Sequence, residues 1–347
     1  MRGVAAAVEN VGGALVAARV VDGALDDLYV DSPPSDLTPQ PEAMYWGRVD
    51  RAAPAIGAAF VALPDGQRGW LRGADRKAGE MVGVQVSRWA EAGKAAPLTD
   101  RPILKGALAL LTPGAPGVNL ARSIKGHETR ERLTAVAGAA LAGAGEDVGL
   151  VIRSAAGDAD EAALTAEIAA LRAAFDAVQE QPAGREPSLL RAAPDAEARA
   201  RRDWADADWL DGPEPFERLG VWDAIEALRS PRVTLPGGGW MSVEATAALV
   251  AVDVNTGEDF SKTASQTANL AACAALPRAL RLRGFGGLVY IDFAPLKKGA
   301  RQGVDLALKR AFAVDPVETQ VVGWTPAGAV ELQRKRERRP TMALIRG

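Results

Sequence analysis

Apolar and polar positions alternate over much of the first hundred residues, a pattern typical of short strands. We predict strands at Val4–Val8 and Ala14–Val21, and several more between residues 45 and 98, where proline–glycine turn signals separate the apolar runs. Residues 32–41 (SPPSDLTPQP) interrupt the pattern with prolines, which stop both helix and sheet. The chain is therefore predicted to begin with a hairpin, continue through an extended linker and form a small all-β barrel.

Helical spacing enters the pattern after residue 100. In residues 160–180, Leu164, Ile168, Leu171 and Phe175 recur three or four apart, as on the buried face of a helix. Residues 101–190 otherwise mix strand and helix patterns, and we expect one exposed helix between residues 183 and 215. In the last third we predict strands at 246–255, 287–293 and 318–323, and helices at 263–284 and 301–313.

Two residues mark the first of those last helices. Pro277 is expected to kink it or to start a second segment, because proline lacks the N–H that a helix interior uses. Gly284 is well placed to cap its C-terminus. The whole pattern predicts an α/β protein of several subdomains with an inserted all-β barrel.

Length bears on the number of packed modules, and the distribution of charge bears on a polyanionic partner. The chain has 347 residues, which favours two or three packed modules over a single core. Its net charge is −3, yet residues 297–347 carry eleven Lys/Arg against five Asp/Glu. This basic block is consistent with binding a polyanion at one face, and equally with an ordinary solvated surface.

The rarest residue types exclude several chemistries. The chain has one cysteine, Cys273, and one histidine, His127. An internal disulfide, a CxxC zinc site and mechanisms that need two histidines are therefore excluded, and a reducing, cytoplasmic location is expected. Cys273 lies in an alanine-rich run and is predicted to be a packed structural thiol. No apolar run reaches the roughly 18 residues that a membrane span needs.

The predicted barrel interleaves aromatic residues with arginines. This composition suits single-stranded nucleic acid, because bases stack on aromatic rings and phosphates pair with arginine. The alternative is that some of these aromatic residues belong to the barrel core. The residues concerned are Trp46, Phe60, Trp70, Trp89, Arg48, Arg68, Arg72 and Arg88.

Two aspartates near the ends of predicted strands form the strongest candidate site. Asp253 and Asn255 end one strand and Asp292 ends the next, with a helix between them. A strand–helix–strand unit implies parallel strands, which are about 4.8 Å apart when adjacent, so both carboxylates could share one cation. Hard oxygen ligands in small number favour Mg²⁺, whose bound water would supply the nucleophile. The alternative is that Asp253 caps a helix or bonds a turn and that Asp292 pairs with an arginine.

Several motifs resemble the ribonuclease E/G family. The run AVDVNTG, an NLAA helix, RALRLRGFGG and a strand ending in IDF follow one another in the family's order at residues 251–293. Residues 47–71 resemble its OB-fold, 149–157 (GLVIRSAAG) its 5′-monophosphate pocket, and 329–338 (AVELQRKRER) its LLEMSRQR motif. The resemblance implies a magnesium-dependent endoribonuclease that cuts single-stranded RNA in rRNA maturation or mRNA decay, leaving 5′-phosphate and 3′-hydroxyl ends.

The resemblance also assigns roles to single residues. Asp253 and Asp292 match the family's metal-binding aspartates, and Asn255 matches the asparagine that orients the scissile phosphate. Arg153 and Ser154 match the 5′-phosphate pocket. By this resemblance Phe60, Trp70, Arg334 and Arg336 are RNA-binding positions, and Glu331, Arg334 and Arg336 are expected near the active site. Arg48 is added to the RNA-binding positions by its place among the barrel aromatics.

The resemblance further implies RNase H-like and DNase I-like α/β parts around the inserted OB-fold. The implied divisions are 1–40 (N-terminal part of the RNase H-like subdomain), 41–100 (OB-fold RNA-binding domain), 101–182 (5′-phosphate sensor region), 183–235 (remainder of the RNase H-like subdomain and connector) and 236–347 (DNase I-like catalytic subdomain).

Some family features are missing. The CPxC zinc-link motif and the small domain after it are absent, so a zinc-linked tetramer is not expected, and a homodimer stays open. Pro295 and Ala247 stand where the family often has acidic residues. Two alternatives therefore stay open beside the nuclease: a non-catalytic RNA-binding protein descended from it, and a phosphodiesterase acting on DNA or small nucleotides.

Overall fold

The computed structural model describes residues 3–73, 76–91, 93–181 and 184–345. The chain divides into two compact units, one made of residues 1–34 and 206–347 and the other of residues 35–205. Across the described residues, no helix combines the length and apolar character that crossing a membrane would require.

The second unit contains the predicted barrel. Its strands pair in the order β4-β5-β6-β8-β7, and β7 also pairs with β4, which closes the sheet on itself. Val49, Val61 and Leu71 lie in its interior. The small all-β barrel expected within residues 41–100 is therefore confirmed. Its elements are β4 (Met44–Ala53), η1 (Pro54–Ile56), β5 (Ala58–Ala62), η2 (Pro64–Gly66), β6 (Arg68–Arg72), β7 (Met81–Val86) and β8 (Ala96–Thr99).

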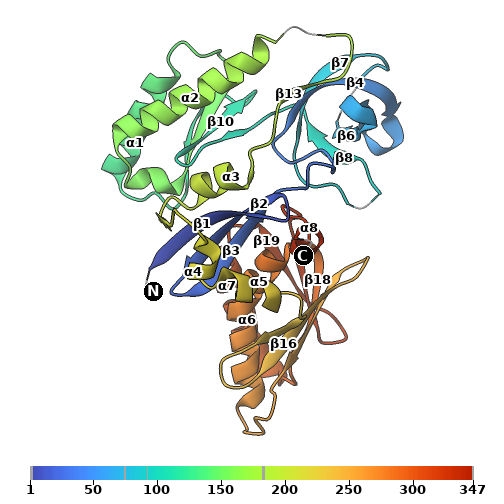
Figure 1. Ribbon diagram of the computed structural model, residues 1–347, viewed down its shortest axis with the longest axis vertical. Helices are drawn as coiled ribbons and strands as arrows, with labels where there is room; N and C mark the ends of the chain where they lie inside the picture. The colour runs from blue at the N-terminus through green and yellow to red at the C-terminus, as the bar shows by residue number, and fades with distance from the viewer. Residues whose placement is uncertain (1–2, 74–75, 92, 182–183, 346–347) are drawn as a thin grey trace. The chain divides into compact units, whose positions relative to one another are not determined.

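The rest of this unit is α/β, as predicted. A sheet of order β11-β12-β10-β9 is covered by two long helices, α1 and α2 (Figure 1). Leu164, Ile168 and Leu171 of α2 are buried there, and Phe175 is half-buried. The elements are β9 (Leu104–Lys105), β10 (Ala109–Pro113), β11 (Gly117–Leu120), α1 (His127–Leu141), β12 (Val148–Ile152), η3 (Ser154–Gly157), α2 (Glu161–Gln179), β13 (Ser188–Arg191) and α3 (Ala196–Asp203).

The connecting region is more ordered than its composition indicated. The expected helix is α3, but β13 also pairs with β4 of the barrel. The sequence pattern misses β13 because it is short and its leucines are exposed or half-buried, which gives no alternation to read.

The first unit begins with an antiparallel sheet. β1 and β2 form the expected hairpin, but the chain continues into a further strand, β3, which the pattern did not predict. Asp26 and Asp27 disguise β3, because aspartate is depleted in strands. The elements around this sheet are β1 (Val4–Val11), β2 (Ala14–Val21), β3 (Ala24–Val30), β14 (Asp208–Trp209), α4 (Pro215–Arg218), α5 (Val221–Ala227) and α8 (Thr341–Leu344).

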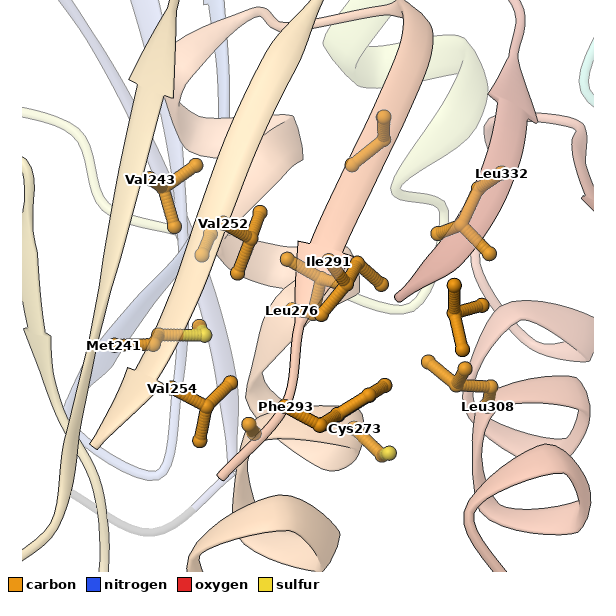
Figure 2. Close-up of a cluster of buried hydrophobic side chains, with 14 of the residues drawn as sticks. Met241, Val243, Val252, Val254, Cys273, Leu276, Ile291, Phe293, Leu308 and Leu332 are labelled. Atoms are coloured by element: carbon orange, nitrogen blue, oxygen red, sulfur yellow. The ribbon is translucent and has the colours of Figure 1, made fainter. Parts of the chain in front are cut away.

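The remainder of the first unit is a mixed sheet with helices on one face. Its strand order is β15-β16-β17-β18-β20-β19. Figure 2 shows valine, isoleucine and leucine side chains from neighbouring strands pointing toward Leu276 and Cys273 of α6 and Leu308 of α7. The elements are β15 (Arg232–Thr234), β16 (Trp240–Ala245), β17 (Val250–Asn255), α6 (Ala264–Arg283), β18 (Gly287–Asp292), η4 (Lys298–Ala300), α7 (Arg301–Ala313), β19 (Thr319–Trp324) and β20 (Val330–Arg334).

Several predictions for this region hold and others need correction. The helix at 301–313 is confirmed, and Gly284 caps α6 in the left-handed region at φ 67°. Of the two outcomes expected at Pro277, a kink or a second helical segment, the second segment is wrong, because α6 continues through Pro277 as one helix. The strand expected from Thr246 starts only at Val250, since residues 246–249 form a hydrogen-bonded turn. β15, β16 and β20 were not predicted.

Cys273 is the packed thiol that the sequence predicted. It is 1% exposed, and its sulfur lies 3.9 Å from the Val304 carbonyl oxygen of α7. Burial raises the pKa of the thiol to about 12, so the group stays protonated at neutral pH. Its role in this fold is to fill space between α6 and α7.

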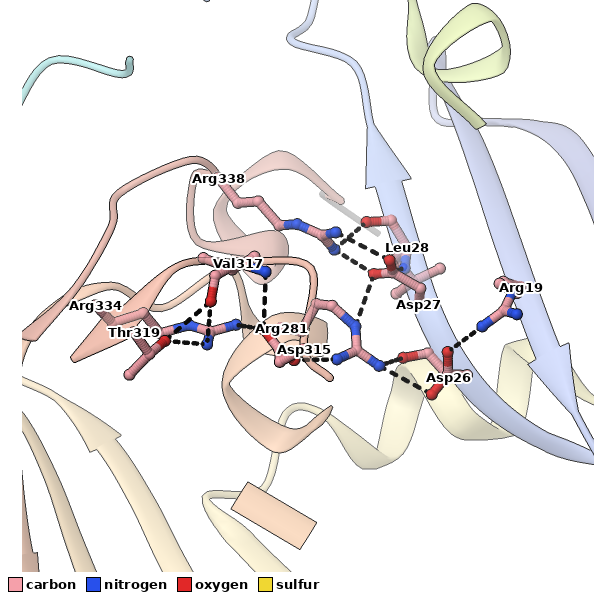
Figure 3. A network of polar contacts seen from close by, with 10 residues as sticks. All are labelled: Arg19, Asp26, Asp27, Leu28, Arg281, Asp315, Val317, Thr319, Arg334 and Arg338. Atoms are coloured by element: carbon pink, nitrogen blue, oxygen red, sulfur yellow. Dashed lines mark hydrogen bonds and ion pairs between the residues drawn. The ribbon is translucent and has the colours of Figure 1, made fainter. Parts of the chain in front are cut away.

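Buried ion pairs connect the two sheets of the first unit (Figure 3). Arg281 of α6 pairs with Asp26 of β3 at 2.9 Å and with Asp315, which in turn pairs with Arg334 at 3.0 Å. Arg338 binds the Asp27 carboxylate with both terminal nitrogens. The Asp315 side chain is fully buried, where its charge is balanced by the guanidinium groups of Arg281 and Arg334 and its carboxylate also accepts a hydrogen bond from the Val317 N–H.

Replacing Asp315 with alanine is predicted to destabilise the first unit strongly. The change leaves Arg281 and Arg334 buried without their shared partner, and breaking a buried pair in this way costs about 3–5 kcal/mol. Urea unfolding followed by circular dichroism measures the change. Glu226→Ala, which removes an exposed partner of Arg229, is the control and should cost under about 1 kcal/mol. Equal losses of unfolding free energy in the two variants would show that the buried ion pairs contribute no more to stability than an exposed pair.

Candidate active site

Asp253 and Asp292 lie directly opposite one another on adjacent strands. β17 and β18 are parallel neighbours, and their register pairs Val252 with Ile291 and Asp253 with Asp292. Paired residues in a sheet project to the same face, and adjacent strands are about 4.8 Å apart. The prediction that the two strands are parallel and adjacent is therefore confirmed, and both carboxylates are exposed on the face away from α6 and α7.

The alternation of β17 explains why the aspartate points outward. Val250, Val252 and Val254 are buried against the helices, so the intervening positions must face the other side. Asn255 shares the outward face with Asp253, and its amide nitrogen donates a 2.7 Å hydrogen bond to an Asp253 carboxylate oxygen. The amide thus holds one carboxylate in place beside the other.

The turn into β18 requires glycine for steric reasons. A side chain at Gly284 would collide with the Arg339 carbonyl oxygen, at 1.9 Å from the position of its first carbon. A side chain at Gly286 would come within 2.7 Å of the Lys335 carbonyl oxygen. The close passage of two backbones therefore fixes where β18 begins, and with it the position of Asp292 five residues after Gly287.

The pair of carboxylates suits a magnesium ion. Mg²⁺ prefers oxygen ligands, keeps several of its waters and is usually held by only one or two protein carboxylates. Among the residues described, no group of three or more His, Cys, Asp or Glu could hold a metal, so a zinc-type cage is not what this face offers. Two exposed carboxylates side by side, with an amide orienting one of them, fit the magnesium preference.

The barrel in the second unit carries two aromatic rings side by side on its outer surface. Phe60 of β5 and Trp70 of β6 are paired across the strands, and both are half-buried. The guanidinium carbon of Arg51 lies 5.1 Å from the Phe60 ring centre, and that of Arg72 lies 5.9 Å from the Trp70 ring. Rings flanked by arginines form a surface on which bases can stack.

The other barrel residues divide between surface and core. Arg48 is 45% exposed and pairs loosely with Glu186 at 3.5 Å. Trp46 is half-buried, and its ring nitrogen donates to the Gly184 carbonyl. Trp89 is 6% exposed, so the alternative reading of a core aromatic holds for that residue.

Arg153 and Ser154 lie where β12 ends in a short 3₁₀ turn. The Arg153 guanidinium donates to the Gly106 carbonyl at 2.6 Å and to Asp203 at 3.3 Å, and the Ser154 hydroxyl lies 2.5 Å from that of Ser123. The Glu167 carboxylate accepts hydrogen bonds from three successive backbone N–H groups at 107–109. These three hydrogen bonds fix the loop that contains Gly106, whose carbonyl oxygen orients Arg153.

A model of the ribonuclease E/G family matches residues 103–211 and 209–337, which together run through more than half of the chain. The chain belongs to the ribonuclease E/G family. This confirms the resemblance found in the sequence motifs.

Individual members of the ribonuclease E/G family show the same relationship. The chain is 30% identical over 352 residues to Ribonuclease E of Nostoc sp., covering 85% of this chain and 51% of that protein. It is 30% identical over 353 residues to Ribonuclease E of Synechocystis sp., covering 85% and 52%. It is 29% identical over 359 residues to Ribonuclease G of Escherichia coli, covering 85% and 72%. The chain spans about half the length of the first two relatives.

Two arginines that the family motif placed near the active site lie elsewhere. β20 runs antiparallel to β18, so Arg334 pairs with Gly287 at the opposite end of β18 from Asp292. Five residues separate these positions, a distance of about 16 Å along the strand. Arg334 is 1% exposed, and burial lowers its pKa, partly offset by Asp315. Expecting Arg334 to contact RNA was therefore wrong, because its side chain belongs to the buried network.

The neighbours of Arg334 have separate positions. Arg336 is half-buried and donates to the Gly286 carbonyl at 3.4 Å, so it too lies at the α6–β18 turn rather than beside Asp292. Glu331 pairs with Tyr290 and shares its face of the sheet, two residues along β18 from Asp292. Of this motif, Glu331 is the residue that the structure brings toward the aspartates.

Asn269 is a supporting residue that the sequence analysis overlooked. It is fully buried in α6, where its amide donates to the Ala294 carbonyl and accepts from the Ala294 N–H, both at 3.0 Å. Ala294 lies two residues after Asp292, so Asn269 fixes the backbone that follows the site. The available signal was a polar residue within the otherwise apolar stripe of a helix, because buried amides require partners.

We predict that Phe60→Ala and Trp70→Ala each weaken binding of single-stranded RNA by the second unit's surface. Loss of one stacking ring typically costs about 1–3 kcal/mol, or roughly 5- to 150-fold in affinity. Fluorescence anisotropy with a labelled oligonucleotide and the full chain measures the change. Leu189→Ala removes a 50% exposed leucine from the neighbouring strand β13 and should bind normally. Unchanged affinity in folded Phe60 and Trp70 variants would remove these rings from the RNA-binding surface.

Proposed function

We propose that this protein is a divalent-metal-dependent endoribonuclease that cuts single-stranded RNA. The observation that carries the proposal is the pairing of Asp253 with Asp292 on adjacent parallel strands, with Asn255 bonded to the first. Family membership supports the same activity, since the relatives' names describe them as ribonucleases. Products with 5′-phosphate and 3′-hydroxyl ends are part of the proposal.

In this proposal the two aspartates bind the metal ion and Asn255 binds the phosphate. Asp253 and Asp292 supply carboxylate oxygens for one Mg²⁺, which when bound would neutralise phosphate charge and lower the pKa of water at the site. The Asn255 amide nitrogen has two N–H donors, and one is used by Asp253. The second can donate to a phosphate oxygen, which would hold the scissile group beside the carboxylates.

RNA must reach this face despite its negative charges. Two carboxylates without a cation repel phosphate, so retention of RNA at the aspartates depends on the divalent ion. The outward face of the barrel, with Phe60, Trp70 and Arg48, would supply stacking and charge without any metal. Binding and cleavage should therefore respond differently to removal of magnesium.

A 5′-monophosphate would be recognised at Arg153 and Ser154. Guanidinium and hydroxyl groups are suitable donors to a phosphate, and both lie at the end of the same strand. Asp203 already pairs with Arg153 at 3.3 Å, so a phosphate would compete with this carboxylate for the guanidinium. Such competition would keep the affinity for the 5′-monophosphate low enough for the RNA 5′ end to be released after cleavage.

The finer architecture belongs to the same proposal. We assign the β1–β3 sheet to the RNase H-like part, the mixed sheet to the DNase I-like catalytic part and the barrel to the OB-fold. The closed barrel supports the last of these assignments.

The change Asp253→Asn tests the proposed activity. It removes one metal-binding charge while keeping the size of the side chain, so cleavage of a 5′-monophosphorylated single-stranded RNA in Mg²⁺ should fall by at least about a hundredfold, a loss of about 2.7 kcal/mol of transition-state stabilisation. Gel analysis of the products measures the rate, and anisotropy should show RNA binding retained at the barrel.

The matched control for this change is Glu244→Gln. Glu244 is an exposed carboxylate on β16 that faces the same side of the mixed sheet, paired with Ala251. Its loss should leave cleavage within a few-fold of the wild-type rate. A wild-type protein that binds the RNA but leaves it intact in Mg²⁺ would instead support the non-catalytic alternative, and preferential cutting of single-stranded DNA would support a different phosphodiesterase.

The change Arg153→Ala tests 5′-end recognition separately. Wild-type protein is expected to cut a 5′-monophosphorylated substrate faster than the same RNA with a 5′-hydroxyl, and the variant should lose this preference. Hydrogen bonds to charged groups contribute about 1.5–3 kcal/mol, so the preference should be roughly 10- to 150-fold. Arg101→Ala changes an exposed arginine of the same unit and should keep the preference. If the Arg153 variant still discriminates between the two ends, the pocket lies elsewhere.

A further inference from the structure

The open face of the mixed sheet carries an aromatic residue directly beside the candidate catalytic residues. Trp240 of β16 is paired across the strands with Asn255, and the next pair on the same face is Ser242 with Asp253. Trp240 is half-buried on a side of the sheet that neither α6 nor α7 covers. We propose that Trp240, together with Arg232, stacks on the unpaired nucleobase that adjoins the scissile phosphate.

The register places Trp240 close to Asp253, the nearer of the two aspartates. Neighbouring strands are about 4.8 Å apart, and two residues along a strand cover about 6.8 Å. The Trp240 ring therefore projects from the strand next to Asp253, at a position two residues further along. A phosphate held at Asn255 and Asp253 would bring one of its two attached nucleosides over this ring.

Arg232 makes the tryptophan part of a larger planar surface. Its guanidinium carbon lies 4.6 Å from the Trp240 ring centre, and Arg232 itself is paired with Ser242 in the same row as Asp253. Nucleobases stack both on aromatic rings and on guanidinium planes, so either exposed group of this pair can carry a base. Arg232 also adds positive charge on a face dominated by carboxylates.

The backbone around Trp240 is held firmly. The turn that precedes β16 packs against the loop that follows β17, where a side chain on Gly257 would come within 2.3 Å of the Gly238 carbonyl oxygen. Gly257 itself adopts φ +64°, which disfavours other residues. The start of β16 and the end of β17 therefore keep a fixed spacing, as a platform beside a reaction site requires.

The inference rests on the proposed nuclease function and adds a reason for its substrate class. A base inside a duplex is already stacked on both faces and cannot lie on Trp240, whereas a base in a single strand can. Preference for single-stranded RNA would then be imposed at the cleavage position itself.

Substrates that lack one base test this proposal. The 5′-monophosphorylated RNA is prepared with a single cleavage site, and with an abasic nucleotide on either the 5′ or the 3′ side of it. For wild-type protein in Mg²⁺, kcat/KM should fall about tenfold or more on one of the two abasic substrates. Trp240→Ala should show a similar fall on intact RNA and no further fall on that abasic substrate, since the same contact is already missing.

Two further variants separate stacking from general damage to the sheet. Trp240→Phe keeps a ring and should retain most of the wild-type rate. Val322→Ala removes a 57% exposed apolar side chain from β19, at the other edge of the same sheet, and should behave as wild type on every substrate.

Either of two results would overturn the platform. One is a Trp240→Ala variant that cuts intact RNA at the wild-type rate. The other is a Trp240→Ala variant whose kcat/KM falls on intact RNA and then falls again, by the same factor as for the wild type, on the abasic substrate. If wild-type protein cuts none of the RNAs, the proposed function fails instead. The platform is then judged by anisotropy, comparing affinities of wild-type and Trp240→Ala proteins for intact and abasic RNA.

Discussion

Two negative charges held side by side are the constraint on which this structure depends. The register of β17 and β18 pairs Asp253 with Asp292 on neighbouring strands. Like unit charges about 4 Å apart repel by about 1 kcal/mol in water and more near a protein surface. A fold that keeps such a pair on an exposed face gains from a divalent cation between them, since one ion would turn the repulsion into attraction.

Much of the first unit serves to fix this register. α6 connects the two strands, and its ends are held differently: Asn269 binds the backbone beyond Asp292, while the turn at Gly284 passes close to the backbone of residues 335–339. Arg281, near the C-terminus of the same helix, extends into the buried ion pairs that reach Asp26 of β3. The helix that positions the aspartates is therefore anchored to both sheets of its unit.

The sequence revealed the parts of this arrangement in which one signal dominates. Apolar alternation around Asp253 and the spacing of strand, helix and strand were sufficient to predict the pairing with Asp292. Buried polar residues gave misleading signals. Asp26 and Asp27 hid β3, and the arginines from Arg334 to Arg339 were expected to form a basic surface, but Arg334 is buried with Asp315.

The role of such residues depends on partners far away in the chain, which composition cannot supply. Trp240 was overlooked for a related reason. It begins a strand that follows a glycine turn, and its importance comes only from the cross-strand pairing with Asn255. Pro277 shows the opposite case, because α6 continues through it as one helix that packs against the mixed sheet, and no second segment begins there.

Direct measurement of cation binding tests the central claim most sharply. Electron paramagnetic resonance of Mn²⁺, used in place of Mg²⁺, counts bound ions without any need for RNA or cleavage. One ion per chain is expected for the wild-type protein, with binding lost when either Asp253 or Asp292 is replaced by asparagine and retained in Glu244→Gln. Equal Mn²⁺ binding by the wild-type protein and both aspartate variants would contradict the account, because the two carboxylates would then not share an ion.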